Sequence, residues 1–159
     1  MSDLQCPATI LIACHGDAEY VRLLVEQVRT RRVAEVYSSA MHRAVESAEM
    51  AASALGVRAV AVVGLQELSV GEQAVALVER FTGALEVIAD RHRGETVLVF
   101  THSRVMALVV PQLPGNVRND HAAQRIPHNS IPVEVEVDSD GWRLISWPGA
   151  TDTSMVGPP

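Results

Sequence analysis

ATILIACHGDAE, residues Ala8–Glu19, changes character in its middle. The run Thr9–Ala13 is continuously apolar and rich in β-branched side chains, which predicts a buried strand. It ends abruptly at Cys14-His15-Gly16, and acidic residues follow at once. A histidine at this position has two interpretations. It either caps the end of the strand through a hydrogen bond or belongs to a site that begins where the strand ends.

A second segment repeats this pattern later in the chain. Residues Glu95–Val105 read ETVLVFTHSRV, so that another apolar strand ends at a histidine, His102. In a sheet of parallel strands, functional residues gather just beyond the carboxyl ends of the strands. If the two strands are neighbours, His15 and His102 meet at one edge of the sheet. The repeated pattern therefore favours a site over a simple cap.

Short apolar runs alternate with amphipathic segments along the rest of the chain. We expect strands at 9–13, 33–37, 57–63 and 96–101, and helices at 19–32, 42–56, 72–92 and 103–110. A polar loop at 116–128 precedes two strands, 130–137 and 142–147, which the turn DSDG joins into a hairpin. This order predicts an α/β fold in three layers, with a mostly parallel central sheet, helices on both faces and a C-terminal antiparallel hairpin.

Length and charge restrict the classes of protein. A chain of 159 residues suggests one domain, which we place at 1–150, with 151–159 as a flexible tail. The net charge of −6 argues against binding to nucleic acid or to an anionic membrane surface. The spacing of the two cysteines fits no zinc pattern. The first residues resemble neither a signal peptide nor a membrane span, so we expect a cytoplasmic protein.

A third strand end adds an anion-binding pattern. The predicted strand 33–37 is followed by Ser38 and Ser39, and Arg43 lies four residues later, near the start of a predicted helix. A helix N-terminus and an arginine side chain both favour an anion, so that together they indicate a phosphate site.

Three motifs now point to one family. SSAMHRAVESA resembles a Ser-Ser/Pro-x-x-Arg-Ala-x-x-Thr-Ala element, with Arg43 as its arginine and Ser47 where threonine is usual. GLQELSVG resembles an acid-bearing Leu-x-Glu-x-x-x-Gly segment, with Glu67 as the acid, and VLVFTHS resembles the strand that carries a second histidine, His102. In this order the chain resembles the histidine phosphatase superfamily, the phosphoglycerate mutase-like phosphatases, from Thr9 to about Trp147.

The resemblance implies a role for each of these residues. His15 would take a phosphoryl group onto its imidazole and yield it to water. Arg43 and a protonated His102 would hold the phosphoryl oxygens, and Glu67 would act as general acid and base. No metal or other cofactor is needed, and the partner is a small phosphorylated metabolite or a phosphate ion. Further contacts to the phosphate are expected from Gly16, Ser39, Ser103 and Arg104.

Cys14 departs from the family pattern, which has Arg-His-Gly at the first strand end. Losing one charged donor costs about 2–4 kcal/mol, or about 10²–10³ in rate. Cys14 is not expected to be a nucleophile, because Tyr20 stands where a Cys-x₅-Arg phosphate loop needs arginine. Whether Arg104 fills the vacant space is left open by the sequence.

Two loops that family members carry also look short or missing here, one after the His-Gly turn and one after the Glu67 segment. The primary interpretation is a phosphatase of phosphate monoesters with reduced activity. The alternative is a catalytically impaired family member that binds a phosphorylated ligand or a protein. A purely structural α/β domain would explain the core but not the paired histidines. The substrate and the oligomeric state stay open.

Overall fold

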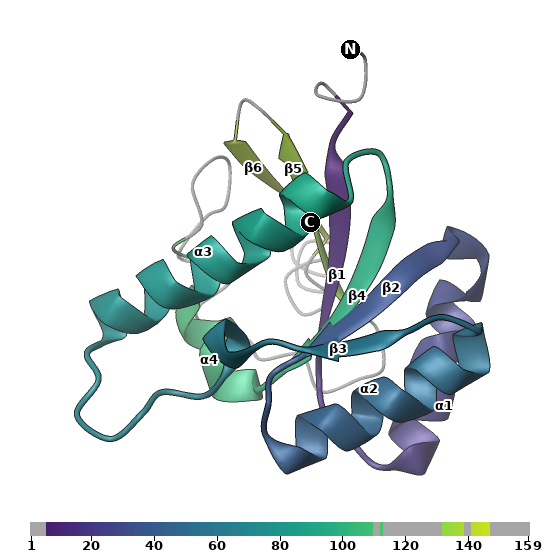
Figure 1. Ribbon diagram of the computed structural model, residues 1–159, viewed down its shortest axis with the longest axis horizontal. Coiled ribbons are helices and arrows are strands. Elements are labelled where there is room, and N and C mark those ends of the chain that lie inside the picture. Colours follow the sequence, from purple (N-terminus) through teal and green to yellow (C-terminus); the bar gives the residue numbers. More distant parts are fainter. Residues whose placement is uncertain (1–5, 110–111, 113–131, 139–140, 147–159) are drawn as a thin grey trace, which may run out of the picture.

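The computed structural model describes residues 6–109, 112, 132–138 and 141–146 (Figure 1). The polar loop expected at 116–128 and the tail expected at 151–159 lie outside these residues. The helices are α1 (Ala18–Val28), α2 (His42–Leu55), α3 (Ala74–Arg91) and α4 (Ser103–Val109), with short 3₁₀ turns η2 (Arg29–Arg31) and η3 (Val63–Leu65). The strands are β1 (Ala8–Cys14), β2 (Val33–Ser38), β3 (Ala59–Ala61), β4 (Thr96–Thr101), β5 (Val133–Asp138) and β6 (Gly141–Ser146).

One mixed sheet joins these strands in the order β3-β2-β4-β1-β5-β6. The pairs β2–β3, β2–β4 and β1–β4 are parallel, whereas β1–β5 and β5–β6 are antiparallel. This confirms the predicted α/β fold, with a mostly parallel sheet and an antiparallel hairpin at its C-terminal edge. The two strands that end at His15 and His102 are direct neighbours, and Cys14 pairs with Thr101.

Alternation of side chains along the strands places helices on both faces. In β1, Ile10 and Ile12 pack in one core together with α3 and α4, whereas Leu11 and Ala13 pack in a second core with α1 and α2. Figure 1 shows α1 and α2 together at the lower right and α3 with α4 on the other side. Both faces are thus covered, as the continuous apolar runs of the parallel strands require.

The first helix and the third strand are shorter than predicted. The first helix ends at Val28 rather than at residue 32, because Val28 is its last buried side chain and the exposed residues that follow form η2. Arg32 then takes a left-handed conformation, with φ 57°, that turns the chain into β2. The third strand covers Ala59–Ala61 instead of 57–63, because the chain leaves the sheet edge to bury Leu65 completely in η3.

The C-terminal hairpin follows its sequence pattern. Val133, Val135 and Val137 are buried, and the two glutamates between them are only half-buried. Glu134 makes a bidentate ion pair with Arg31, at 2.7 and 3.1 Å, which ties the hairpin to the turn before β2. Among the residues that the structure describes, no helix is both long enough and apolar enough to cross a membrane.

Candidate functional site

His15 and His102 meet at the carboxyl ends of β1 and β4. The backbone N–H of His15 donates to the Thr101 carbonyl at 3.1 Å, which extends the parallel pairing by one residue past the strand. The two imidazole rings then lie edge to face, with centroids 5.1 Å apart and an interplanar angle of 71°. The expectation that the two histidines lie close together is confirmed.

His102 is held by a hydrogen bond at one ring nitrogen and faces a carboxylate with the other. Its Nε2 lies 2.9 Å from the Oγ of Ser39, which follows β2 and is fully buried. Its Nδ1 lies 4.0 Å from Oε2 of Glu67, in the segment between η3 and α3. The same Ser39 Oγ accepts from the backbone N–H of Met41, the residue that precedes α2. Ser39 thus orients His102 as well as the start of the helix that carries Arg43.

Gly16 is fixed by Ser47, which the sequence did not place in the site. The Gly16 N–H donates to Ser47 Oγ at 2.9 Å, and that hydroxyl donates back to the Gly16 carbonyl at 2.9 Å. A Cβ at Gly16 would lie 2.3 Å from Cδ1 of Tyr20, so that only glycine fits here. The one sequence signal for Ser47 was its position in the Arg43 motif, where the family has threonine. Phosphate contacts from Gly16 and Ser39 stay predictions.

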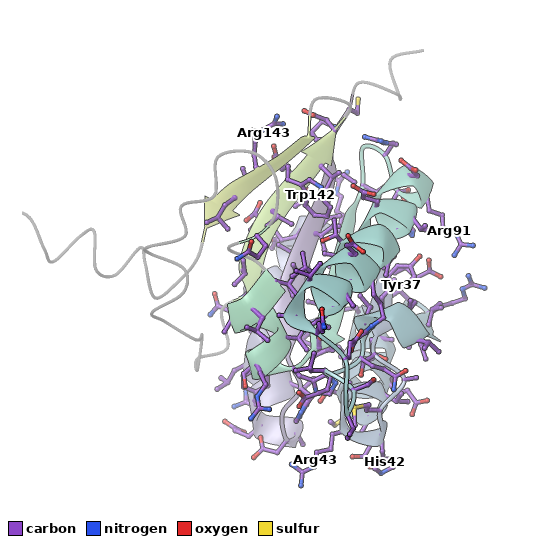
Figure 2. The ribbon with its side chains drawn as sticks, turned by 90° about the vertical axis from the view of Figure 1, so that its left-hand side faces the viewer. Tyr37, His42, Arg43, Arg91, Trp142 and Arg143 are labelled. Atoms are coloured by element: carbon purple, nitrogen blue, oxygen red, sulfur yellow. The ribbon has the colours of Figure 1, made fainter. Side chains whose placement is uncertain are left out.

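Arg43 is the second residue of α2 and is exposed. Figure 2 shows Arg43 and His42 at the lower end of the molecule, and Arg43 is close enough to His15 to lower the pKa of its imidazole. Ser103 and Arg104 are exposed on the first turn of α4. Within the described part of the chain Arg104 makes no hydrogen bond or ion pair, so that its role toward a phosphate stays a prediction.

Burial controls the charge of both histidines. Partial burial lowers the pKa of His15 and the Arg43 charge lowers it further, while Glu67 acts in the opposite direction. Burial also lowers the pKa of His102, again opposed by Glu67 and assisted by His15. At neutral pH both imidazoles are therefore mainly uncharged. A neutral imidazole has one nitrogen with a free lone pair, which a nucleophile requires.

Cys14 points into the core beside α4. Its thiol lies 3.5 Å from the sulfur of Met106, and burial raises its pKa to about 11. At neutral pH the sulfur is a protonated thiol, and the thiolate is the reactive form of cysteine. Cys14 therefore packs as a small, partly buried apolar side chain.

An open groove adjoins Gly16 on the side of α1 and α2. Its lining residues are Gly16, Asp17, Ala18, Glu46, Glu49, Met50 and Ser53. This side of the site is therefore acidic. Across the described ranges, no group of three or more His, Cys, Asp or Glu side chains could hold a metal ion.

Two curated proteins and one solved structure illustrate what this chain is similar to. Phosphoglycerate mutase-like protein 4 of Arabidopsis thaliana is 29% identical over 87 residues, and the metal-independent phosphoserine phosphatase of the same plant is 31% identical over 87 residues. Each alignment covers 55% of this chain, and the chain spans about a third of these relatives, 36% and 34%. The solved structure of YhfR from Bacillus stearothermophilus superposes with a TM-score of 0.76 at 18% identity, covering 87% of this chain and 95% of that chain. This likeness shows a shared fold.

The sequence profile of the histidine phosphatase superfamily (branch 1) matches residues 14–74 and 69–148. These two stretches contain both histidines, Arg43 and Glu67 in the order that the motifs predicted, and they take in most of the chain. The chain therefore belongs to the histidine phosphatase superfamily, branch 1.

Proposed function

We propose that this protein hydrolyses phosphate monoesters through a phosphohistidine intermediate on His15. One observation carries the proposal: His15 and His102 meet at the carboxyl ends of neighbouring strands, at 5.1 Å, beside Arg43. The lowered pKa of His15 supports a nucleophilic role, because an uncharged imidazole is the form that can attack phosphorus.

In the first step a His15 ring nitrogen forms a bond to phosphorus while the bond from phosphorus to the ester oxygen breaks. Glu67 gives its proton to the departing oxygen, so that the alcohol leaves uncharged. Arg43 and His102 hold the phosphoryl oxygens as negative charge spreads over them. An incoming phosphate dianion beside His102 favours protonation of that imidazole, which offsets the effect of burial.

In the second step a water molecule attacks the phosphorus and the bond from nitrogen to phosphorus breaks. Glu67, now a carboxylate, accepts the proton of the water, so that phosphate leaves and His15 returns to its neutral form. The Oε2 of Glu67 lies 4.0 Å from the Nδ1 of His102. This distance supports a role for Glu67 beside the transferred group in both steps.

The names of the relatives and the start of α1 support a substrate class. We infer a small phosphorylated metabolite, since one relative is named a phosphoserine phosphatase and another a phosphoglycerate mutase-like protein. Asp17 caps α1 by accepting from the Tyr20 N–H, so that the helix begins at Ala18, directly after the His15-Gly16 turn. No long loop covers the site at this point.

Cys14 supports a lowered activity. Its thiol contacts Met106 in the core and presents no charged donor to a phosphate. By analogy with the loss of a single oxyanion donor, the expected cost is about 10²–10³ in rate. The same residue favours the second candidate function, a catalytically impaired member that binds a phosphorylated ligand.

Hydrolysis of 4-nitrophenyl phosphate from about pH 5 to pH 8, with chelator present, tests these two functions. The native chain, His15→Ala and Cys14→Arg are compared, each checked for folding by circular dichroism. Turnover by the native chain that disappears in His15→Ala supports the phosphatase. Turnover only in Cys14→Arg supports the binding function. If all three proteins are folded and none hydrolyses the ester, the assignment of His15 as a nucleophile is overturned.

A further inference from the structure

Glu67 lies in a segment without regular structure. Residues Gln66–Gln73 connect η3 to α3 and form neither helix nor strand. The Glu67 side chain is 40% exposed, and within the described residues its carboxylate accepts no hydrogen bond. A general acid must nevertheless stay within reach of the group that it protonates. Its position therefore depends on what holds the backbone of this segment.

Arg80, on the second turn of α3, binds that backbone directly. Its Nη1 donates to the carbonyls of Gly64 and Gln66 at 2.9 and 3.1 Å. Its Nη2 donates to the carbonyl of Glu67 itself at 3.1 Å. One guanidinium group thus binds three backbone carbonyls at and just before Glu67. A flexible ammonium group could not bind all three in one plane.

Glu72 holds the guanidinium in this orientation. Its carboxylate accepts from Arg80 Nε and Nη2 at 2.9 and 2.8 Å, and also from the backbone N–H of Ser69 at 3.0 Å. The hydrogen bonds from Arg80 and then from Ser69 lower the pKa of Glu72 to about 2. The pair therefore stays charged at every pH at which an enzyme of this kind would work.

The segment is also fixed at its amino end. The Thr101 hydroxyl donates to the Leu65 carbonyl at 3.0 Å, and Thr101 directly precedes His102. A Cβ on Gly64 would lie 2.9 Å from the Cβ of Ala84, so that η3 lies tightly against α3. The backbone next to Glu67 is thus tied both to the strand that bears His102 and to α3.

We propose that the Arg80–Glu72 pair is the positioning element for Glu67. This inference rests on the proposed phosphatase function and makes Arg80 and Glu72 positioning residues, since neither needs to touch the substrate. Loosening the pair lets the Glu67 carboxylate leave its place while the fold of the sheet and the two histidines remain.

Two esters with different leaving groups separate this role from a general loss of structure. The anion of 4-nitrophenol leaves without a proton, whereas an alkoxide from an alkyl phosphate such as glycerol 1-phosphate needs one. The value of kcat/KM reports the steps up to phosphoryl transfer, in which Glu67 acts as acid. In Arg80→Lys we expect kcat/KM to fall about 10–100-fold for the alkyl ester and less than about 3-fold for the aryl ester.

The controls follow from the same geometry. Glu67→Gln should show the same discrimination between esters, and adding Arg80→Lys to it should increase that discrimination no further. Arg29→Ala removes an exposed arginine that pairs with Glu26 on α1, and it should leave kcat/KM unchanged for both esters. Equal losses on both esters in Arg80→Lys would overturn the proposal, because a smaller folded fraction lowers both alike.

An NMR titration of His102 tests the positioning without turnover. Glu67 raises the pKa of His102, so Glu67→Gln should lower it, and Arg80→Lys or Glu72→Gln should lower it too. An unchanged His102 titration in folded Arg80→Lys and Glu72→Gln would overturn the inference. If the native chain hydrolyses neither ester, the phosphatase function is overturned instead. The His102 titration alone then decides whether Arg80 positions Glu67.

Discussion

His102 and His92 lie at opposite ends of β4, and both are nearly buried, with 4% and 8% of their surface exposed. Their partners differ. His92 places Nδ1 2.7 Å from Oε1 of Glu95, and its Nε2 lies 3.1 Å from Oε1 of Glu35 and 2.7 Å from the Tyr37 hydroxyl. His102 has a serine hydroxyl on one side and no carboxylate nearer than 4.0 Å among the described residues.

The polar groups around His92 form hydrogen bonds with one another. Burial raises the pKa of Glu35, but hydrogen bonds from Tyr37, Arg58 and His92 outweigh it and lower the pKa overall. Figure 2 shows Tyr37 at about mid-height of the molecule and Arg43 at its lower end. Each buried polar group at this end of β4 is satisfied by a neighbour, which is the usual condition for a structural network.

At the other end of β4, the imidazoles of His15 and His102 have fewer polar partners than His92 among the described residues. Burial removes water from His15 and His102, yet the protein supplies too little negative charge to keep them protonated. Such uncompensated burial costs stability and is typical of sites that bind a ligand. The comparison teaches that partners, more than burial, distinguish the structural His92 from His102, for which we propose a function.

Replacing His102 and His92 by glutamine, one at a time, should separate activity from stability. The loss of activity in His102→Gln is the largest effect that we expect. His102→Gln keeps a polar atom near Ser39 but removes the imidazole, so kcat/KM toward an aryl phosphate should fall about 10²–10³-fold. His92→Gln should leave kcat/KM of the folded protein within about 2-fold. A large loss of activity in His92→Gln at full folding would show that the two ends of β4 are coupled.

The sequence predicted the parts of the site that adjoin regular strands. His15, Ser39 and His102 each follow an apolar run by one or two residues, and the sheet order brings those ends together. Two apolar strands ending at histidine were therefore enough to predict that the imidazoles meet. Arg43 was predicted near this edge because a helix N-terminus follows Ser39 closely in the chain, and it is the second residue of α2.

The contacts made across the fold could not be predicted in this way. Ser47 reaches Gly16 from the second turn of α2, and Arg80 reaches the Glu67 segment from α3. Both depend on how helices pack, which the periodicity of a single segment does not contain. His92 follows no apolar strand, and its burial likewise depends on packing, because Glu35 and Tyr37 of β2 bind its ring.

A second comparison measures the stability of the hydrogen-bonded groups around His92. His92→Gln should lower the free energy of unfolding by about 1–3 kcal/mol, because Tyr37 and Glu35 lose a buried partner. His42 is a matched control: its exposed imidazole pairs with Glu46 at 3.1 Å on the surface of α2. His42→Gln should change stability by less than about 0.5 kcal/mol.

Urea denaturation followed by circular dichroism measures both variants. The slope of the free energy against urea should be the same in each, so that the midpoints compare directly. If His92→Gln were as stable as His42→Gln, the network around His92 would contribute nothing to folding, and the contrast with His102 would rest on pKa alone.

The smallest effect that we expect is in the dependence of stability on pH. His15 and His102 have pKa values below the ordinary 6.5 in the folded protein, so that below pH 6.5 the unfolded chain binds protons that the folded chain does not. The free energy of unfolding should therefore fall as the pH drops from 6.5. Glutamates with lowered pKa, such as Glu72, add the same trend only below their ordinary value of 4.5.

The interval between pH 6.5 and pH 4.5 thus reports on the histidines rather than on these glutamates. In the double variant His15→Gln/His102→Gln, the free energy of unfolding should fall less steeply across it than in the native chain. Every other titrating group is the same in the two proteins, so the difference between the slopes belongs to the site. Equal slopes would mean that the site releases no proton on folding, and that the contrast between the two ends of β4 does not extend to protonation.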